Sequence, residues 1–121
     1  MKITFTDIDK WKIIKPNGRI DWENARTLDL ETKNLIESGS YHLVFDLDDV
    51  SFICSGGIGV LAYNLAKVKR KGGAIWIISN NEYVNYIFET MKFSIIFEGY
   101  FFKTFDAFKA AVMPSVDTTT K

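Results

Sequence analysis

The chain begins with alternating polar and apolar positions, a pattern that predicts β-strands. Residues 2–6 alternate in this way, and residues 11–15 form a second strand-like run. Pro16-Asn17-Gly18 stands between this run and the next element, and its composition is typical of a turn. We therefore expect two N-terminal strands that pair as a hairpin.

Helical and strand-like patterns then follow one another. Asp21 is typical of a helix N-cap, because its carboxylate accepts a hydrogen bond from the first turn, and Gly39 marks the expected helix end. Residues 41–46 contain a nearly continuous apolar run, as expected for a strand buried on both faces. The apolar face of the first helix is predicted to hold Trp22, Ala25, Leu28, Thr32 and Leu35.

The second half repeats this alternation. A second helix has an apolar face and ends before Gly72-Gly73, and residues 74–79 read as another buried strand. A helix is expected after Asn80-Asn81, a short strand over residues 93–97, and a last helix capped by Thr104 and ended by Pro114. The apolar face of the second helix consists of Ile58, Leu61, Leu65 and Val68.

The predicted order is β-β-α-β-α-β-α-β-α. Strands that alternate with helices predict an α/β fold with a mixed, mostly parallel sheet and right-handed crossovers. The N-terminal hairpin would add an antiparallel edge to this sheet, and about four helices would cover it. We expect one domain over residues 1–113, followed by a polar tail over residues 114–121.

Composition narrows the class of function. The 121 residues carry a formal net charge of zero, which argues against general nucleic-acid binding because that requires a basic face. One cysteine excludes an internal disulfide, and one histidine excludes a multi-histidine metal site. No apolar run approaches the roughly 20 residues of a membrane span. We therefore expect a cytoplasmic protein without metal or cofactor and without membrane or nucleic-acid partners.

The stretch SFICSGGIGV, residues 51–60, is the most unusual feature. Its small residues lie between the strand-like run Ser51-Phe52-Ile53 and the second helix. Ser55 is here a candidate helix cap, nucleophile, phosphate-binding residue or phosphate acceptor. The glycine spacing matches neither of the common nucleotide-binding motifs. The only potential base, His42, is expected on the surface at the far end of the preceding strand, which argues against nucleophilic catalysis.

Two interpretations of this stretch remain compatible. Ser55 suits a helix cap, and Cys54 suits a small buried apolar position. Three glycines in four residues are nevertheless costly at the start of a helix, at roughly 1 kcal/mol each. A close approach by a partner or a modifying enzyme would explain them, because small residues leave the backbone and the Ser55 hydroxyl uncovered.

The stretch from Val44-Phe45-Asp46-Leu47 to Val60-Leu61 resembles the core motif of STAS domains, and more narrowly that of bacterial anti-sigma factor antagonists. Gly18-Arg19-Ile20-Asp21 is similar to the family's "GxLD" segment, and Lys71-Gly72-Gly73 to its "GG" before the next strand. Residues 84–97 also resemble the corresponding family segment. The resemblance covers residues 2–112.

The resemblance implies partner switching without enzymatic activity. In such proteins the unmodified form binds a serine kinase that doubles as an anti-sigma factor. Phosphorylation by that kinase ends the binding, and a serine phosphatase reverses it. By position, the acceptor corresponds to Ser55, and Cys54 stands where the family usually has Asp. The partner surface implied by the resemblance comprises Asp21, Cys54, Ser55, Gly56, Gly57, Ile58 and Gly59.

Two other functions are compatible with this stretch. One is a STAS interaction module that docks a partner without being phosphorylated. The other is a sensor of a small anionic or apolar ligand near the helix entry at Gly56.

Overall fold

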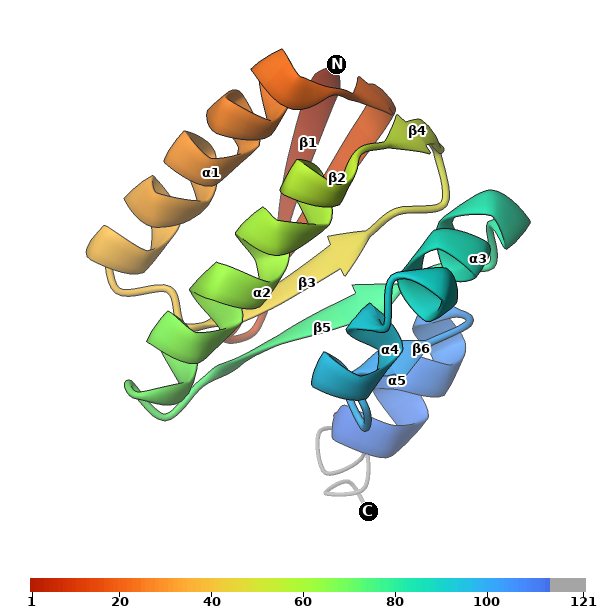
Figure 1. Ribbon diagram of the computed structural model, residues 1–121. Helices are drawn as coiled ribbons and strands as arrows, with labels where there is room; N and C mark the ends of the chain where they lie inside the picture. Colours follow the sequence, from red (N-terminus) through yellow and green to blue (C-terminus); the bar gives the residue numbers. More distant parts are fainter. Residues whose placement is uncertain (114–121) are drawn as a thin grey trace.

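The computed structural model describes residues 1–113 (Figure 1), so the predicted tail over residues 114–121 lies outside the described part. None of the helices within residues 1–113 is long and apolar enough to cross a membrane. In chain order the elements are β1 (Lys2–Ile8), β2 (Trp11–Ile20), α1 (Trp22–Glu37), β3 (His42–Asp46), β4 (Val50–Ile53), α2 (Ser55–Lys69), β5 (Ala74–Ile78), α3 (Glu82–Thr90), α4 (Phe93–Ile96), β6 (Phe101–Phe102) and α5 (Phe105–Val112).

The six strands form one mixed sheet in the order β1-β2-β3-β5-β6, with β4 paired to β2 beyond the end of β3. Only β1 and β2 are antiparallel, and the remaining pairs are parallel. This confirms the predicted α/β class, the mostly parallel sheet and the N-terminal hairpin. The described chain has five helices rather than about four, and β4 adds a strand to the predicted order.

The turn predicted at Pro16-Asn17-Gly18 is wrong, because β2 continues through these residues to Ile20. The hairpin turns earlier, where Asp9 adopts a positive φ of 54°. β2 pairs with β3 up to Ile14 and with β4 from Gly18 onward. Pro16 therefore lies between the two partners, where its missing N–H removes no ladder hydrogen bond on that side.

The strand predicted over residues 93–97 is also wrong, because Phe93–Ile96 form the short helix α4. A helical turn brings Phe93 and Phe97 to the same face, and Phe97 is fully buried while Ile95 and Ile96 are exposed. A short apolar run fits either a helix or a strand by its pattern alone. The last strand is instead β6, which pairs with β5.

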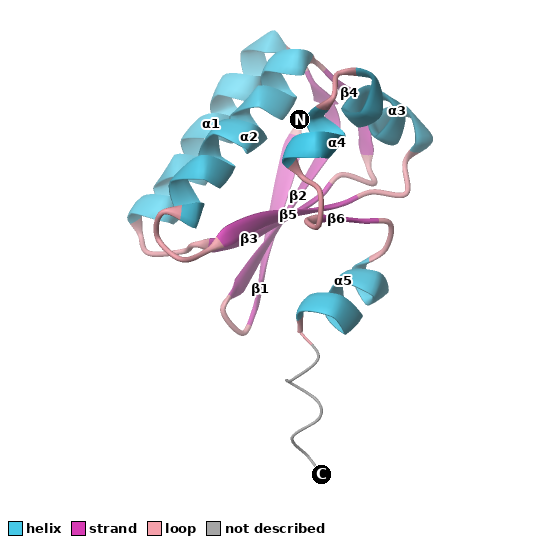
Figure 2. Ribbon diagram, turned by 60° about the horizontal axis from the view of Figure 1, so that its bottom comes forward, coloured by secondary structure: helices cyan, strands magenta, loops and turns pink. Residues whose placement is uncertain are grey.

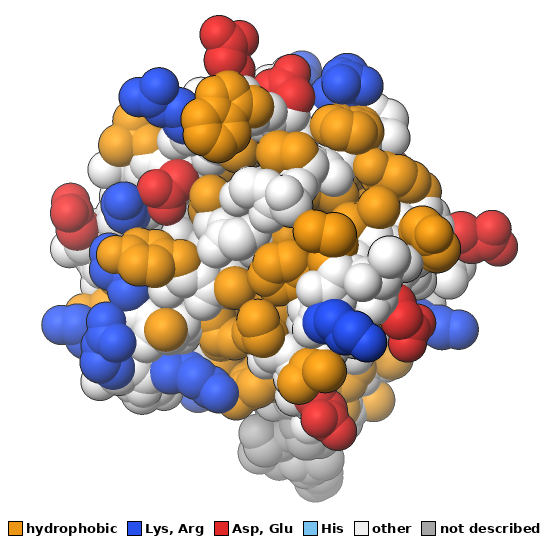
Figure 3. All heavy atoms as spheres, in the orientation of Figure 1, with side chains coloured by type: hydrophobic (Ala, Val, Ile, Leu, Met, Phe, Trp, Pro, Cys, Tyr) orange, Lys and Arg blue, Asp and Glu red, His pale blue; other side chains and the backbone are white. Residues whose placement is uncertain are grey.

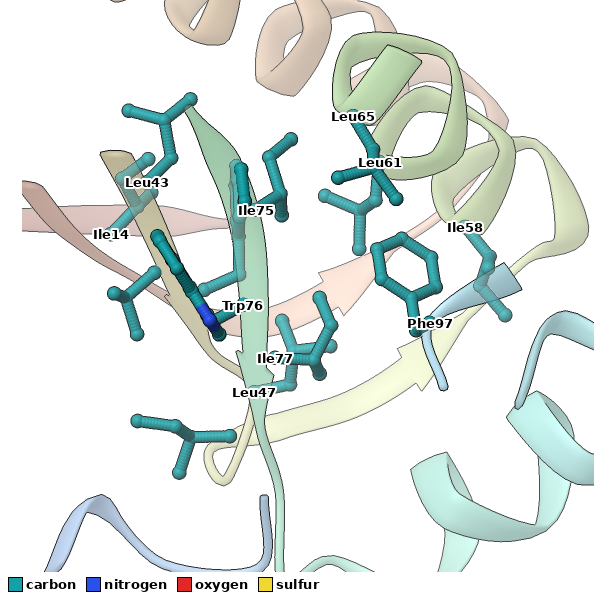
Figure 4. Close-up of a cluster of buried hydrophobic side chains, with 14 of the residues drawn as sticks. Ile14, Leu43, Leu47, Ile58, Leu61, Leu65, Ile75, Trp76, Ile77 and Phe97 are labelled. Atoms are coloured by element: carbon teal, nitrogen blue, oxygen red, sulfur yellow. The ribbon is translucent and has the colours of Figure 1, made fainter. Parts of the chain in front are cut away.

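Helices cover both faces of the sheet. Figure 2 shows α1 and α2 on one face and α5 on the other. On the first face Ile58, Leu61 and Leu65 of α2 are buried and point toward the central strands (Figure 4), as their helical spacing predicts. Both faces of β5 are buried, which confirms the buried strand that its continuous apolar run predicted.

The opposite face contains an aromatic cluster under α5. Phe108 of α5 packs edge to face on Trp11 and Trp76, with ring centroids 6.5 and 5.7 Å apart. His42 stacks on Trp76 at 6.0 Å and meets the edge of Trp11 at 6.2 Å. His42 is therefore partly buried rather than on the surface as predicted. Burial, and to a lesser extent the charge of Lys10, lowers its pKa below the usual value.

This environment predicts that acid destabilises the fold through His42. Because the folded state favours the neutral imidazole, the stabilising contribution is complete above about pH 6.5, the ordinary pKa of histidine, and falls as the pH drops below it. His42→Phe should retain the ring stacking without the proton. We expect the wild-type melting temperature to decrease more than that of His42→Phe between pH 7.5 and pH 5.5, two values about one unit either side of that pKa. Parallel melting curves of both proteins would contradict this assignment.

Candidate functional site

The SFICSGGIGV stretch lies where β4 ends and α2 begins. The predicted strand-like run Ser51-Phe52-Ile53 belongs to β4, in which Ile53 pairs with Ile20 at the end of β2. The N–H of Cys54 then donates to the carbonyl of Ile20 at 3.0 Å. The entry to α2 is therefore held directly against the end of β2.

Cys54, not Ser55, is the N-cap of α2, so the prediction of a Ser55 cap is wrong by one residue. The Cys54 side chain makes no capping hydrogen bond and is only half-buried. Ser55 and Gly56 form the exposed first turn. Since the first N–H groups of a helix have no partner within it, those of Ser55 and Gly56 depend on water or a ligand.

The start of α2 differs in this respect from the other helices of eight or more residues within residues 1–113. Each of these begins with a side chain that accepts hydrogen bonds from first-turn N–H groups. The capping residues are Asp21 for α1, Asn81 for α3 and Thr104 for α5.

The glycines of the stretch serve different purposes. A Cβ atom on Gly57 would lie 2.9 Å from Cγ2 of Ile20 and 3.1 Å from Cγ1 of Ile53, so Gly57 permits close packing on the sheet. Ile58 is fully buried in the core. A Cβ on Gly59 would meet nothing within 4 Å. Gly56 and Gly59 are therefore the glycines that leave accessible surface beside Ser55.

Asp21 caps α1 as predicted. Its carboxylate accepts from the Asn24 N–H at 3.0 Å, and the Asn24 side chain accepts from the Asp21 N–H at 2.8 Å, which completes a reciprocal capping box. Asn24 also donates to the carbonyl of Arg19 at 2.9 Å. This network fixes the start of α1 next to the end of β2.

The helical spacing predicted that Trp22 would lie on the buried face of α1. This prediction is wrong, because Trp22 is 75% exposed. A Cβ on Gly56 would lie 3.9 Å from Cε3 of Trp22, so the indole lies beside the entry to α2. Trp22 is the first residue of α1, and helical side chains lean toward the N-terminus, so its indole extends past the buried part of the face that holds Ala25 and Leu28. The sequence reasoning missed this residue, and its helical spacing pointed to the core instead.

The N-cap and the first turn of α3 hold β4 from the other side. The Asn81 amide donates to the Val50 carbonyl at 2.7 Å, and the Tyr83 hydroxyl to the Ile53 carbonyl at 3.4 Å. Phe52 stacks on Tyr83 with ring centroids 6.2 Å apart, and the Arg19 guanidinium lies 4.3 Å from the Phe52 centroid. These residues were not predicted, because each contact joins elements far apart in sequence.

The carboxylates at the end of β3 and in the following loop tie the strand to that loop. Asp46 accepts from the Asp48 N–H at 3.1 Å, and Asp48 accepts from the Asn80 N–H at 2.6 Å. The Lys15 ammonium lies 4.0 Å from Asp46 and 3.5 Å from Asp49. Burial is the main cause that raises the pKa of Asp46, and the neighbouring carboxylates add to it. This arrangement gives the acidic residues a structural role in the connection.

A ligand or metal site elsewhere would need a suitable hollow or a cluster of ligating side chains. A surface hollow on α1 does not include Gly56, and its lining gives no support to the predicted ligand sensor at that position. Within residues 1–113, no three His, Cys, Asp or Glu side chains gather as a metal site. The hollow is lined by Arg26, Thr27, Asp29, Leu30 and Lys33.

Comparison with known families gives this geometry a context. The STAS domain family matches residues 2–111. The chain belongs to the STAS domain family. BtrV of Bordetella bronchiseptica, a candidate anti-sigma factor antagonist, is 27% identical over 97 residues, which are 80% of this chain and 84% of BtrV.

Solved structures show the same STAS fold. A candidate anti-sigma factor antagonist of Thermotoga maritima has a TM-score of 0.83 at 22% identity, over 92% of this chain and 94% of that one. The Bacillus cell fate determinant SpoIIAA in its phosphorylated form has a TM-score of 0.71 at 14% identity, over 92% of this chain and 99% of that one. The resemblance to anti-sigma factor antagonists predicted from the motif is thus confirmed, and this is an antagonist-like STAS protein.

Gly57 and Gly59 are a matched pair for testing the packing of α2 in this STAS domain. Gly57→Ala should destabilise the fold by about 1–3 kcal/mol, because the new methyl group overpacks Ile20 and Ile53. Gly59→Ala should stabilise it by up to about 1 kcal/mol, because the site is open and alanine favours the helix. Urea unfolding of both variants measures the two effects. Equal changes of the same sign would show that the close approach at Gly57 does not constrain α2.

Proposed function

We propose that this chain is a phosphorylation-switched anti-sigma factor antagonist. Unmodified, it binds a serine kinase that doubles as an anti-sigma factor, and phosphorylation of Ser55 ends that binding. A serine phosphatase restores the active form. The chain itself acts as a cytoplasmic binding protein rather than as an enzyme. The observation that carries the proposal is the exposed Ser55 at a helix start that lacks a side-chain cap.

Two properties of this helix start favour phosphorylation. The Ser55 hydroxyl is exposed next to an exposed glycine, so a kinase active site has access to it. The uncapped first-turn N–H groups and the positive end of the helix dipole stabilise an added phosphate. Cys54 in place of the family's usual Asp leaves no carboxylate at the preceding position to repel it.

The same modification disfavours a packed interface. A phosphate adds about −1.5 to −2 charges near pH 7. At an interface built around an uncharged hydroxyl, the partner can bind only if this charge is desolvated, which is unfavourable. The fold need not change, because the phosphate has favourable partners in the first turn of α2. The switch therefore acts on binding and leaves the domain intact. A Bacillus structural relative, SpoIIAA, is known in both unphosphorylated and phosphorylated forms.

The proposed contact surface surrounds Ser55. Of the residues that the family resemblance assigns to it, Ser55 and Gly56 are exposed, and Asp21, Cys54 and Gly59 are partly exposed. Gly57 and Ile58 are buried, and they contribute by fixing the position of α2. We add Trp22, whose exposed indole beside Gly56 offers a large rigid anchor, a residue type enriched at interface hot spots.

Intact-mass measurement tests the switch. The tagged chain, expressed in its own host, should carry one added phosphate in a fraction of molecules, and phosphatase treatment should remove it. Ser55→Ala should lose this phosphate, whereas Ser51→Ala, which removes an exposed serine from the same stretch, should keep it.

The binding half of the proposal is tested with a serine kinase encoded near this chain, which must be identified by copurification with the wild type. Wild type and Ser55→Ala should bind it, and Ser55→Glu should bind about 100-fold more weakly, a loss of about 2.7 kcal/mol. If the kinase bound but Ser55 never carried a phosphate, the switch would be refuted and the chain would be a phosphorylation-independent docking module. A phosphate on another residue would refute the site.

Trp22→Ala should weaken binding of the same kinase by about 10–100-fold, as expected for a hot-spot aromatic residue. The fold should be unaffected, because the side chain is 75% exposed, and Leu30→Ala on the same helix is the matched control at 59% exposure. Trp11 and Trp76 are at most 9% exposed, so among the tryptophans of this chain Trp22 is the one whose fluorescence should shift to the blue on binding, and Trp22→Ala should lose that shift. An unchanged affinity of Trp22→Ala would exclude the indole from the interface.

A further inference from the structure

The outer edge of β1 is the longest unpaired strand edge within residues 1–113. β1 is the outermost strand of the sheet (Figure 2), and it pairs with β2 on one side only. All seven of its residues are paired to β2 without a register shift, and the strand contains no proline. Natural proteins usually blunt such an edge with prolines, bulges or charged side chains, because it is a template for another strand. The charged residues of β1, Lys2 and Asp7, stand near its two ends and leave its centre uncharged.

Apolar side chains at this edge are exposed. Phe5 is 42% exposed, Ile8 37% and the adjacent Met1 38%. Phe5 pairs with Ile14, so it lies on the face that α1 and α2 cover, yet the helices leave it open. The outer strand thus presents both free backbone groups and apolar surface. Figure 3 shows that apolar side chains also reach the surface elsewhere, but the other free edges within residues 1–113, on β4 and β6, belong to strands of four and two residues.

We propose that β1 pairs with β1 of a second copy of this chain, antiparallel and centred on Phe5. A twofold axis perpendicular to the sheet places the same face of both copies on the same side of the joined sheet. Directly opposite residues point to the same face, so both numbers are odd or both are even, and their sum is even. Centring on Phe5 opposes the whole of Lys2–Ile8 with its copy. Phe5 then faces Phe5, and Thr4 faces Thr6, pairs that stabilise antiparallel strands.

Charge favours this register and this occupant. Registers centred on Lys2 or Asp7 would set like charges directly opposite, which is destabilising. With Phe5 at the centre, Lys2 faces Ile8 and Asp7 faces Ile3, so no like charges meet. Asp7 is already paired with Lys12 inside each copy. The formal net charge of zero also removes long-range repulsion between copies.

Sedimentation equilibrium tests this dimer. Because one strand pair is a small interface, we expect association in the range of about 10 µM to 1 mM. The average mass of the wild type should rise from one chain toward two over that range. Phe5→Lys, which sets two ammonium groups opposite each other, should remain at one chain. Leu30→Lys, which removes an exposed apolar residue from α1, should behave as the wild type.

A wild type that stays at the mass of one chain throughout would overturn the proposal, as would a Leu30→Lys variant that dissociates as Phe5→Lys does. Cross-linking tests the register without relying on Phe5→Lys. In a Cys54→Ala background, Phe5→Cys should form a disulfide-linked dimer under mild oxidation, because the Cα atoms of directly opposite residues lie about 4.5–5.5 Å apart, within the range that a disulfide spans. Ile8→Cys faces Lys2 and should not. The opposite result would refute the register centred on Phe5.

Discussion

The division of β2 between two partners is the constraint on which the site depends. β2 pairs with β3 along its first half and with β4 along its last residues, and Pro16 lies at the change of partner. This division allows the chain to return to the end of β2 after β3. The Cys54 N–H can then bind the Ile20 carbonyl, and Gly57 can pack on Ile20 and Ile53. The entry to α2 is thereby fixed beside the start of α1.

Because the entry to α2 is held against the end of β2, where α1 begins, the first turns of the two helices lie side by side. The start of α1 is closed by the Asp21 capping box, whereas the start of α2 has no side-chain cap. The contrast leaves first-turn N–H groups free at Ser55 and places an exposed indole next to them. In the proposed switch, these N–H groups stabilise the phosphate within the fold, and the added charge disfavours a packed interface.

The parts of the fold that depend on local pattern were predictable. Asp21 and Thr104 have the side chains that caps require, and both cap helices. The predictions failed where a distant neighbour decided the outcome. The local sequence around Pro16 is typical of a turn. In the structure Pro16 lies within β2, at a point where neither β3 nor β4 pairs with it. Residues 93–97 fit a strand by composition, but they form a helical turn, which buries Phe97.

The amino-acid sequence by itself determined the alternating helices and strands, the buried face of α2 and the exceptional stretch around Ser55. These follow from periodicity and from side-chain chemistry, which act between residues close in the chain. Only the tertiary structure decided that Cys54 rather than Ser55 occupies the cap, that Trp22 is exposed beside Gly56, and that Asn81 and Tyr83 support β4. Each of these depends on contacts between elements that pairing and packing bring together, and no local pattern encodes which elements will meet.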